Sequence, residues 1–254
     1  MQTLYFHGSP GSAAELSLFG AERPDGFTVP NRQGVPKVRG FEQRLDYWAS
    51  LADEMAQHGA LTIAGFSMGG YLALSVAARM QSSDVPVHLI APAAPFQSGD
   101  YMDRLNGKPI FKLAQTSGVL LRAVVAMQSL ACRTLPALVA RQLFAASKGG
   151  DALLAKDAQF MEQAAENLRQ GVGRGSAQFC EEVLSAVEDW RGLLAEVHNP
   201  VSIWHGDADN WAVPEMSDYL AANLPNLAAH NRLAGVSHYS ALQHYLSQVV
   251  NSPR

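Results

Sequence analysis

The stretch AGFSMGGYLAL, residues 64–74, decides the fold of this 254-residue chain. It continues an apolar run and precedes a segment with helical spacing, so Ser67 lies at a turn from a strand into a helix. Any side chain at Gly65 or Gly69 would strike the turn or its neighbouring strand, and a serine held there has a strained backbone and an exposed hydroxyl. Because the chain has 21 glycines, the G-x-S-x-G pattern alone is weak evidence, and its surroundings decide its meaning.

The composition predicts a globular protein with a large core, because 48% of the residues are hydrophobic and 17% are charged. The net charge of −4 argues against nucleic acid or a membrane surface as a partner. Two cysteines, Cys132 and Cys180, are too few for a disulfide framework, and the N-terminal residues lack the pattern of a secretion signal. We therefore expect a cytoplasmic protein.

Outward from Ser67, short apolar runs alternate with helical segments. Helices are expected from Phe41 to Met55, directly after Ser67, from Pro214, and from about Tyr239. Strands are expected at 3–6, 26–30, 61–66, 86–92, 200–206 and 227–233. Continuously apolar strands that alternate with helices predict an α/β fold, with a parallel sheet covered on both faces.

Residues 99–197 interrupt this alternation. Helical periodicity dominates there, and glycine-bearing breaks divide it at SKGGD (147–151) and QGVGRGS (170–176). We expect residues 1–98 and 198–254 to form the α/β core, and residues 99–197 to be a helical insertion over one edge of the sheet.

The loops that follow the strands carry the residues suited to chemistry. In a parallel α/β sheet, ligands bind beyond the carboxyl ends of the strands, where all of these loops lie. HGSPGS (7–12) follows the first strand and Ser67 follows the third; HGDADNWAVP (205–214) and GVSH (235–238) follow the last two. A serine, an acid and a histidine thus occupy three separate loops on one rim.

With these four loops, the chain resembles the α/β-hydrolase family. The order Ser67, Asp209, His238 is the family's order of nucleophile, acid and histidine, HGSPGS is similar to its oxyanion loop, and the insertion lies where the family often carries a helical cap. The resemblance implies a reduced, mostly parallel six-stranded sheet, because the family's first two strands are missing before the strand at 3–6. VPNRQG (29–34) resembles a Pro-Asp-x-x-Gly turn of the family, with Asn31 in place of the aspartate.

The resemblance also implies acyl transfer in two steps by a Ser-His-Asp triad. Ser67 attacks a carbonyl carbon, His238 removes its proton, and Asp209 orients the imidazole. The oxyanion is expected to meet the N–H groups of Met68 and Ser9, since the next residue in that loop is a proline without an N–H. This predicts a serine hydrolase that cleaves a small, fairly apolar carboxylic ester without a cofactor or a metal.

Further acids and histidines compete with Asp209 and His238 for their roles. Asp207 is the first competitor of Asp209, but it follows the strand so directly that we expect it to lie too close to the strand end. Asp103 is a second competitor of Asp209, and His230 and His244 compete with His238. We expect His7 and His205 to be structural.

The reaction has alternatives within and beyond ester hydrolysis. Carbon–carbon bond hydrolysis on the same triad is one, and a non-catalytic ligand-binding module on a hydrolase scaffold is another. An amide- or peptide-cleaving, iminopeptidase-like enzyme would need acids in the insertion to hold a free amine; the candidates, which fit a solvated helix face equally well, are Glu162, Glu166, Glu181 and Glu182. We expect a minority of six apolar side chains to line an acyl pocket: Phe111, Met127, Leu130, Phe144, Phe160 and Met161. The sequence leaves the substrate-binding residues and the oligomeric state open.

Overall fold

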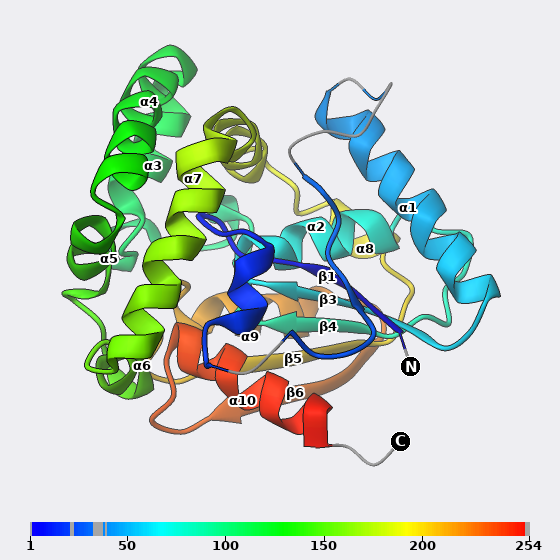
Figure 1. Ribbon diagram of the computed structural model, residues 1–254. Helices are drawn as coiled ribbons and strands as arrows, with labels where there is room; N and C mark the ends of the chain where they lie inside the picture. The colour runs from blue at the N-terminus through cyan, green and yellow to red at the C-terminus, as the bar shows by residue number, and fades with distance from the viewer. Residues whose placement is uncertain (1, 21–22, 33–37, 39, 252–254) are drawn as a thin grey trace.

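The computed structural model describes residues 2–20, 23–32, 38 and 40–251. Six strands form one sheet in the order β2-β1-β3-β4-β5-β6, and every pairing is parallel (Figure 1). The strands are β1 (Gln2–Phe6), β2 (Phe27–Thr28), β3 (Leu61–Phe66), β4 (Val87–Ile90), β5 (Val201–Gly206) and β6 (Leu227–Leu233). The predicted six-stranded α/β sheet is therefore confirmed. The last two residues of the VPNRQG turn lie outside the described ranges.

The strand order places the switch in winding direction at β1 and β3. The chain leaves β1 toward β2 on one side and returns to pair β3 on the other. In open α/β sheets the loops at such a point diverge and leave a crevice for ligands. The loop that begins at His7 and the turn that holds Ser67 both follow strands at this point.

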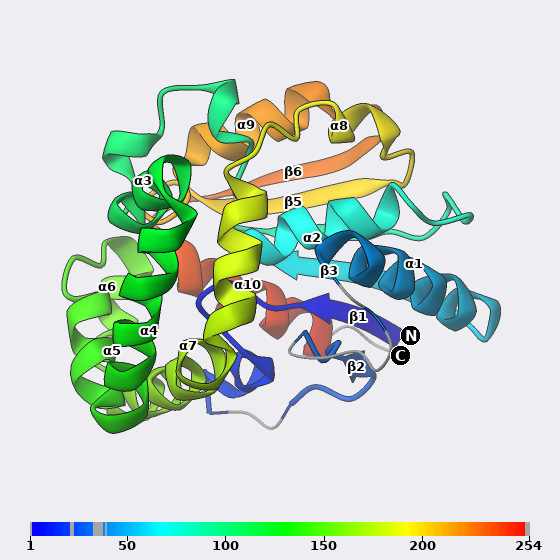
Figure 2. The ribbon, with the colours of Figure 1, turned by 90° about the horizontal axis from the view of Figure 1, so that it is seen from above.

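The two faces of the sheet pack against different helices, because side chains alternate along each strand. From β1, Leu4 and Phe6 join a buried cluster with α1, α2 and α9, whereas Tyr5 joins a second cluster with α10 (Figures 1 and 2). These helices are α1 (Phe41–Gln57), α2 (Met68–Ala77), α9 (Pro214–Asn223) and α10 (His238–Asn251). Helices on both faces explain why the central strand β3 is buried at every position.

The predicted insertion is helical in the structure. Its helices α3 to α7 gather beyond the carboxyl ends of the strands, while α8 packs against α2 and α9 (Figure 2). The helices of the insertion are α3 (Lys108–Thr116), α4 (Gly118–Thr134), α5 (Pro136–Phe144), α6 (Gly149–Leu154), α7 (Ala158–Ala186) and α8 (Leu193–Glu196), with the short 3-10 helix η3 (Met102–Arg104) before them. Two further 3-10 helices, η1 (Ala13–Ser17) and η2 (Phe96–Ser98), lie outside the insertion. The limits of this cap at residues 99 and 197 stay a prediction.

The two glycine-bearing breaks connect helices in different ways. SKGGD separates α5 from α6, as predicted. QGVGRGS joins two helical segments, as predicted, but through a kink and not a loop: α7 bends at Gly175, whose backbone (φ −106°, ψ 26°) leaves the helical range. One residue outside the helical range redirects the rest of the helix, so this stretch produces a kink rather than an end.

Candidate active site

Ser67 lies at the sharp turn between β3 and α2. Its backbone has φ 55° and ψ −125°, a strained conformation for a residue with a side chain. A Cβ on Gly65 would lie 2.3 Å from the Gly69 carbonyl oxygen, and a Cβ on Gly69 would lie 2.1 Å from that of Phe6. The predicted reason for both glycines is confirmed, since any larger residue would push the turn away from the sheet.

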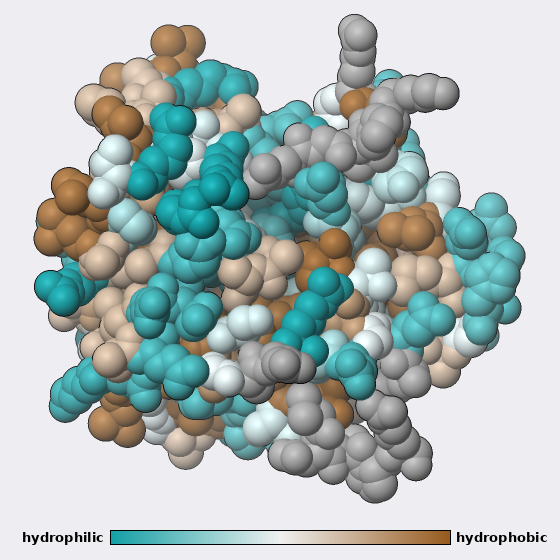
Figure 3. All heavy atoms as spheres, viewed as in Figure 1, coloured by the Kyte–Doolittle hydropathy of each residue, from teal (hydrophilic) through white to brown (hydrophobic). Residues whose placement is uncertain are grey.

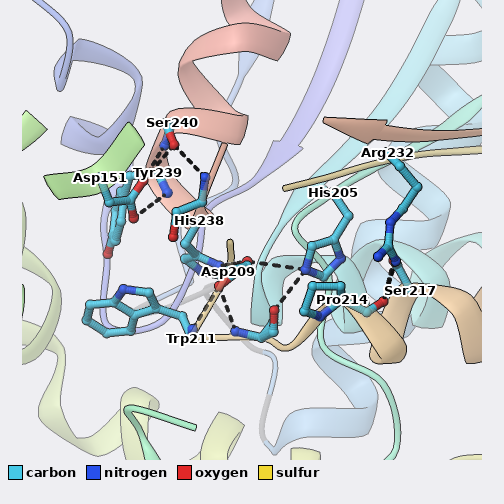
Figure 4. A network of polar contacts seen from close by, with 12 residues as sticks. Asp151, His205, Asp209, Trp211, Pro214, Ser217, Arg232, His238, Tyr239 and Ser240 are labelled. Atoms are coloured by element: carbon cyan, nitrogen blue, oxygen red, sulfur yellow. Dashed lines mark hydrogen bonds and ion pairs between the residues drawn. The ribbon is translucent and has the colours of Figure 1, made fainter. Parts of the chain in front are cut away.

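Asp209 and His238 form a direct hydrogen bond in the loops after β5 and β6. The Nδ1 of His238 lies 2.7 Å from Asp209 Oδ2, and both side chains are buried (Figure 4). The other carboxylate oxygen, Oδ1, accepts the N–H groups of Trp211 (2.7 Å) and Ala212 (3.1 Å). Because Nδ1 donates to the carboxylate, the Nε2 of a neutral His238 is the nitrogen that can accept a proton.

A second histidine, His205, also contacts this carboxylate. Its Nε2 lies 3.2 Å from Asp209 Oδ2 and 2.8 Å from the Ala212 carbonyl oxygen, which requires a hydrogen on that nitrogen. Burial by itself would raise the pKa of Asp209, but the charge of His238 and hydrogen bonds from both histidines outweigh it and hold the pKa well below its usual range. The acid is therefore ionised at neutral pH. His205 was expected to be structural, and its contact with the acid was not anticipated.

Aromatic rings fix the orientation of His238. Its ring lies 4.7 Å from that of Phe66 and 5.9 Å from that of Trp211, with which it is nearly parallel at 21°. Phe66 directly precedes Ser67, so the same contact joins the serine turn to the histidine loop.

The competing acids and histidines lie elsewhere. Asp207 accepts a hydrogen bond from the Gly235 N–H at 2.8 Å, which ties the acid loop to the histidine loop. Asp103 is exposed and pairs with two lysines. The competing histidines have other partners: His230 lies against Ser217 and His244 against Gln248. His7, which was expected to be structural, lies against Arg32. Of the candidate acids, the structure places Asp209 against His238.

The loop that holds Ser9 is fastened to helix α7 of the cap. Ser9 Oγ donates to Glu182 Oε2 (2.7 Å), and Glu182 forms a buried ion pair with Arg32 (3.2 Å). About four turns earlier in α7, Asn167 Oδ1 accepts both the N–H and the hydroxyl of Ser12 at 2.8 Å. Between them the backbones nearly touch, since a Cβ on Gly171 would lie 2.3 Å from the Gly11 carbonyl oxygen. Ser9 and Met68 line the same cavity as Ser67, and their role as oxyanion donors stays a prediction.

A buried carboxylate, Glu15, binds the backbone at the beginning of this loop. It accepts the Tyr5 hydroxyl at 2.6 Å and the Gly8 N–H at 3.0 and 3.1 Å. Burial raises the pKa of Glu15 to about 7, although these hydrogen bonds and Arg32 oppose the shift. The Gly8 N–H is thereby occupied and is no candidate for binding an oxyanion.

We expect the stability of the protein to depend on the ionisation of Glu15. Its pKa is higher in the folded than in the unfolded chain, so its contribution is most favourable at low pH and is lost as the pH rises through about 7. The loss amounts to at most about 3 kcal/mol. Urea unfolding of wild type and Glu15→Gln at about pH 5.5 and about pH 8 should show a smaller pH dependence in the variant. Exposed Glu162→Gln is the control, and equal pH dependence in all three proteins would contradict this role.

Asp151 of α6 holds the start of α10, the helix that begins with His238. Its carboxylate accepts the N–H groups of Tyr239 (3.0 Å) and Ser240 (2.7 Å) and the Ser240 hydroxyl (2.8 Å) (Figure 4). The first N–H groups of a helix have no partner within the helix and attract negative charge. This residue was not predicted from the sequence, although it ends the SKGGD break and is fully buried.

Asp151→Ala should both destabilise the protein and slow catalysis. It leaves buried N–H groups unpaired, which costs about 2–3 kcal/mol, and frees the turn that orients His238. We expect kcat to fall roughly tenfold with little change in KM, because the substrate cavity is untouched. Asp151→Asn retains one acceptor oxygen and should recover part of both losses. Unfolding curves and kcat measured on the same preparations test this, and an alanine variant with wild-type kcat would refute it.

A cavity of about 610 Å³ opens beside Ser67. Ser9, Ser67 and Met68 line it together with apolar side chains from α3, α4, α5 and α7. Of the six apolar side chains proposed for an acyl pocket, Phe111 lines the cavity. Phe144 and Phe160 are buried in the cluster around α10, with Met161 packed against it. Met127 and Leu130 point outward, 67% and 57% exposed, so only a minority of the six lines the cavity, as expected.

Comparisons with known proteins bear on the fold and the family of this chain. Among the described residues, no three His, Cys, Asp or Glu side chains are grouped to hold a metal ion. The search of curated proteins finds no match. Three similar solved structures are a thermophilic esterase from Thermogutta terrifontis (18% identity, 98% of this chain and 88% of that chain, TM-score 0.63), the enol-lactonase from Burkholderia xenovorans (14%, 98% and 90%, 0.60) and a bromoperoxidase from Bacillus anthracis (15%, 98% and 90%, 0.59).

These identities are low, so the three structures establish the fold alone. The family evidence comes from the sequence, because residues 26–240 match the family described as serine aminopeptidase, S33. That range includes the serine turn, the acid loop and the histidine at the start of α10. The chain is therefore a hydrolase of the α/β-hydrolase fold and belongs to the serine aminopeptidase family S33.

Proposed function

We propose that this hydrolase cleaves carboxylic esters with an apolar acyl group. The observation that carries the proposal is the position of Ser67 on the wall of a cavity of about 610 Å³ with mostly apolar side chains. Cavities of roughly 300–1,000 Å³ enclose small ligands, and apolar walls bind an acyl chain by removing its surface from water. A few polar groups at one end, where Ser9 and Met68 lie, then suffice to orient the ester carbonyl.

In the proposed reaction, Ser67 Oγ attacks the ester carbonyl carbon while His238 Nε2 takes the hydroxyl proton. Asp209 stabilises the imidazolium, and the backbone N–H groups of Ser9 and Met68 bind the oxyanion. His238 returns the proton to the leaving alcohol. Water then attacks the acyl-enzyme with His238 again as base, which releases the acid and restores Ser67. No cofactor is required.

Cleavage of an aminoacyl substrate is the main alternative, since the family takes its name from aminopeptidases. Binding a free amine needs an acid in the cap whose charge is not already neutralised. Three of the four acids considered pair with arginines: Glu166 with Arg169, Glu181 with Arg44 and Glu182 with Arg32. The fourth, Glu162, is exposed on α7. This arrangement favours the ester.

The thiols suit a reducing compartment. Cys132 and Cys180 are both free and buried, as expected where disulfides do not form. We therefore propose that the enzyme acts in the cytoplasm.

A panel of p-nitrophenyl esters from acetate to dodecanoate tests the acyl preference. Each methylene buried in the cavity should raise kcat/KM about fourfold until the cavity is filled. Aminoacyl arylamides form the second arm, and faster turnover of these would favour the aminopeptidase. A fluorophosphonate that labels Ser67 in wild type but not in His238→Ala would support the triad. No labelling of the folded wild type would favour a ligand-binding module.

A further inference from the structure

Exposed apolar side chains are concentrated on one part of the cap. In the part of the chain that the structure describes, eight large apolar side chains are exposed, and seven of them lie between residues 119 and 153. Six belong to α4, α5 and the residue between these two helices, which contact one another. We call these six the cap patch: Val119, Leu120, Met127, Leu130, Leu135 and Leu138. In Figure 3, hydrophobic side chains lie along the left edge of the molecule, over α4 and α5.

Helix α4 is apolar on both of its faces. Val119, Met127 and Leu130, spaced eight and three residues apart, lie on its outer side and are 82%, 67% and 57% exposed. On the inner side, Leu121 and Val125 are buried. A helix at a water-facing surface normally carries polar residues outside, and a gathered apolar face indicates an interaction site.

The charged side chains on the segment that carries the cap patch all have one sign. Residues 117–148 include four basic residues and no acidic one, although the whole chain has a net charge of −4. The four side chains are exposed: Arg122, Arg133, Arg141 and Lys148. The net charge of the chain thus conceals a cationic surface on the cap. A second copy of the chain seated there would bring like charges together, whereas an anionic surface would attract them.

We propose that the cap patch docks on the surface of a membrane that contains anionic lipids. Apolar side chains that enter the boundary of the acyl chains, flanked by cations at the headgroups, are the pattern of a protein lying in the interface. In the described ranges no single helix is both long and apolar enough to cross a bilayer; α4 and α5 reach that length only as a pair bent by 114°. They therefore lie on the membrane rather than span it.

Docking in this way would bring the acyl cavity to the membrane. Val124 and Ala131 of α4 and Val139 of α5 line the cavity from the inner side of the helices that carry the cap patch. An apolar substrate could pass from the lipid to the cavity with little exposure to water. The docking itself does not depend on Ser67 or on hydrolysis, so it can be tested separately.

Vesicle flotation with the full-length protein tests the proposal. Wild type should bind vesicles of phosphatidylcholine with roughly 30% phosphatidylglycerol, and bind pure phosphatidylcholine at least tenfold more weakly. Leu120→Gln/Met127→Gln/Leu130→Gln should reduce binding to the anionic vesicles at least tenfold. Arg122→Gln/Arg141→Gln/Lys148→Gln should reduce it about a hundredfold, at roughly fivefold for each cation removed. Tyr47→Gln, which removes the exposed apolar side chain on α1, is the matched control and should bind like wild type.

The same variants should hydrolyse a water-soluble short ester at the wild-type rate, because none of the substituted side chains lines the cavity; this shows that they are folded. The proposal is overturned if wild type fails to bind anionic vesicles or binds both kinds equally. It is also overturned if wild type is a dimer that the Leu120/Met127/Leu130 variant separates into monomers, since the cap patch would then be an interface between copies.

Discussion

Ser67→Ala should lower kcat for ester hydrolysis by about 10⁴- to 10⁶-fold, because it removes the oxygen that bonds to the acyl carbon. The stability should change little. The strained backbone at Ser67 (φ 55°) is imposed by the turn between β3 and α2, and alanine must adopt it as serine does. The rate with the preferred ester of the panel, together with unfolding curves, measures both effects.

Ser9→Ala is the matched control for this variant. Ser9 lies in the same cavity and also carries a hydroxyl, but its predicted contribution is the backbone N–H, which alanine retains. We expect a loss of no more than about tenfold, through the missing contact with Glu182. A fluorophosphonate should still label Ser9→Ala and not Ser67→Ala. Equal rates for Ser67→Ala and wild type would remove Ser67 from the reaction.

Asp209→Asn should reduce kcat by about 10³- to 10⁴-fold with a smaller change in KM. The Oδ1 position accepts the N–H groups of Trp211 and Ala212, so the carbonyl oxygen of asparagine will occupy it. The amide NH₂ must then replace Oδ2 and face His238 Nδ1. A donor there favours the tautomer with its hydrogen on Nε2, which cannot accept the proton of Ser67.

The neighbouring Asp207→Asn separates this effect from a general disturbance of the acid loop. Asp207 bonds to the Gly235 N–H through one oxygen, and asparagine can supply the same acceptor. Its kcat should stay within a few-fold of wild type. An Asp209→Asn enzyme that retains a tenth of the wild-type kcat would mean that the tautomer of His238 is not controlled by this residue.

Much of the fold follows from local pattern. The run at 61–66 is mostly apolar because β3 is buried at every position, and glycine is required at 65 and 69 because backbone atoms approach there. The loops of Ser67, Asp209 and His238 could be identified for the same reason, since each follows a recognisable strand. Parallel strands then bring these loops to one edge without any further information.

Contacts between distant segments could not be predicted in this way. Glu182 follows another acid, Glu181, on α7 and fits a solvated helix face in the sequence, yet it is buried against Ser9, 173 positions earlier in the chain. Asp151 is likewise an ordinary acid beside a glycine until α10 is placed next to it. Met127 and Leu130 were candidates for the acyl pocket but lie on the outer side of α4, because helical spacing defines a face without telling which side of the helix is buried.

Hydrogen bonds join one part of the cap to the catalytic loops. The cap therefore has two parts that differ in how freely each could be replaced by the corresponding segment of a relative. Residues 149–186 hold the loops through Asp151, Asn167 and Glu182, so replacing them would require replacing the loops as well. Helices α3 to α5, by contrast, line the cavity without supporting the histidine or the serine turn through any of these bonds. A chimera that takes residues 108–144 from a relative should therefore acquire a new acyl preference on an intact catalytic centre, whereas one that takes 99–197 must import the matching loops to work at all.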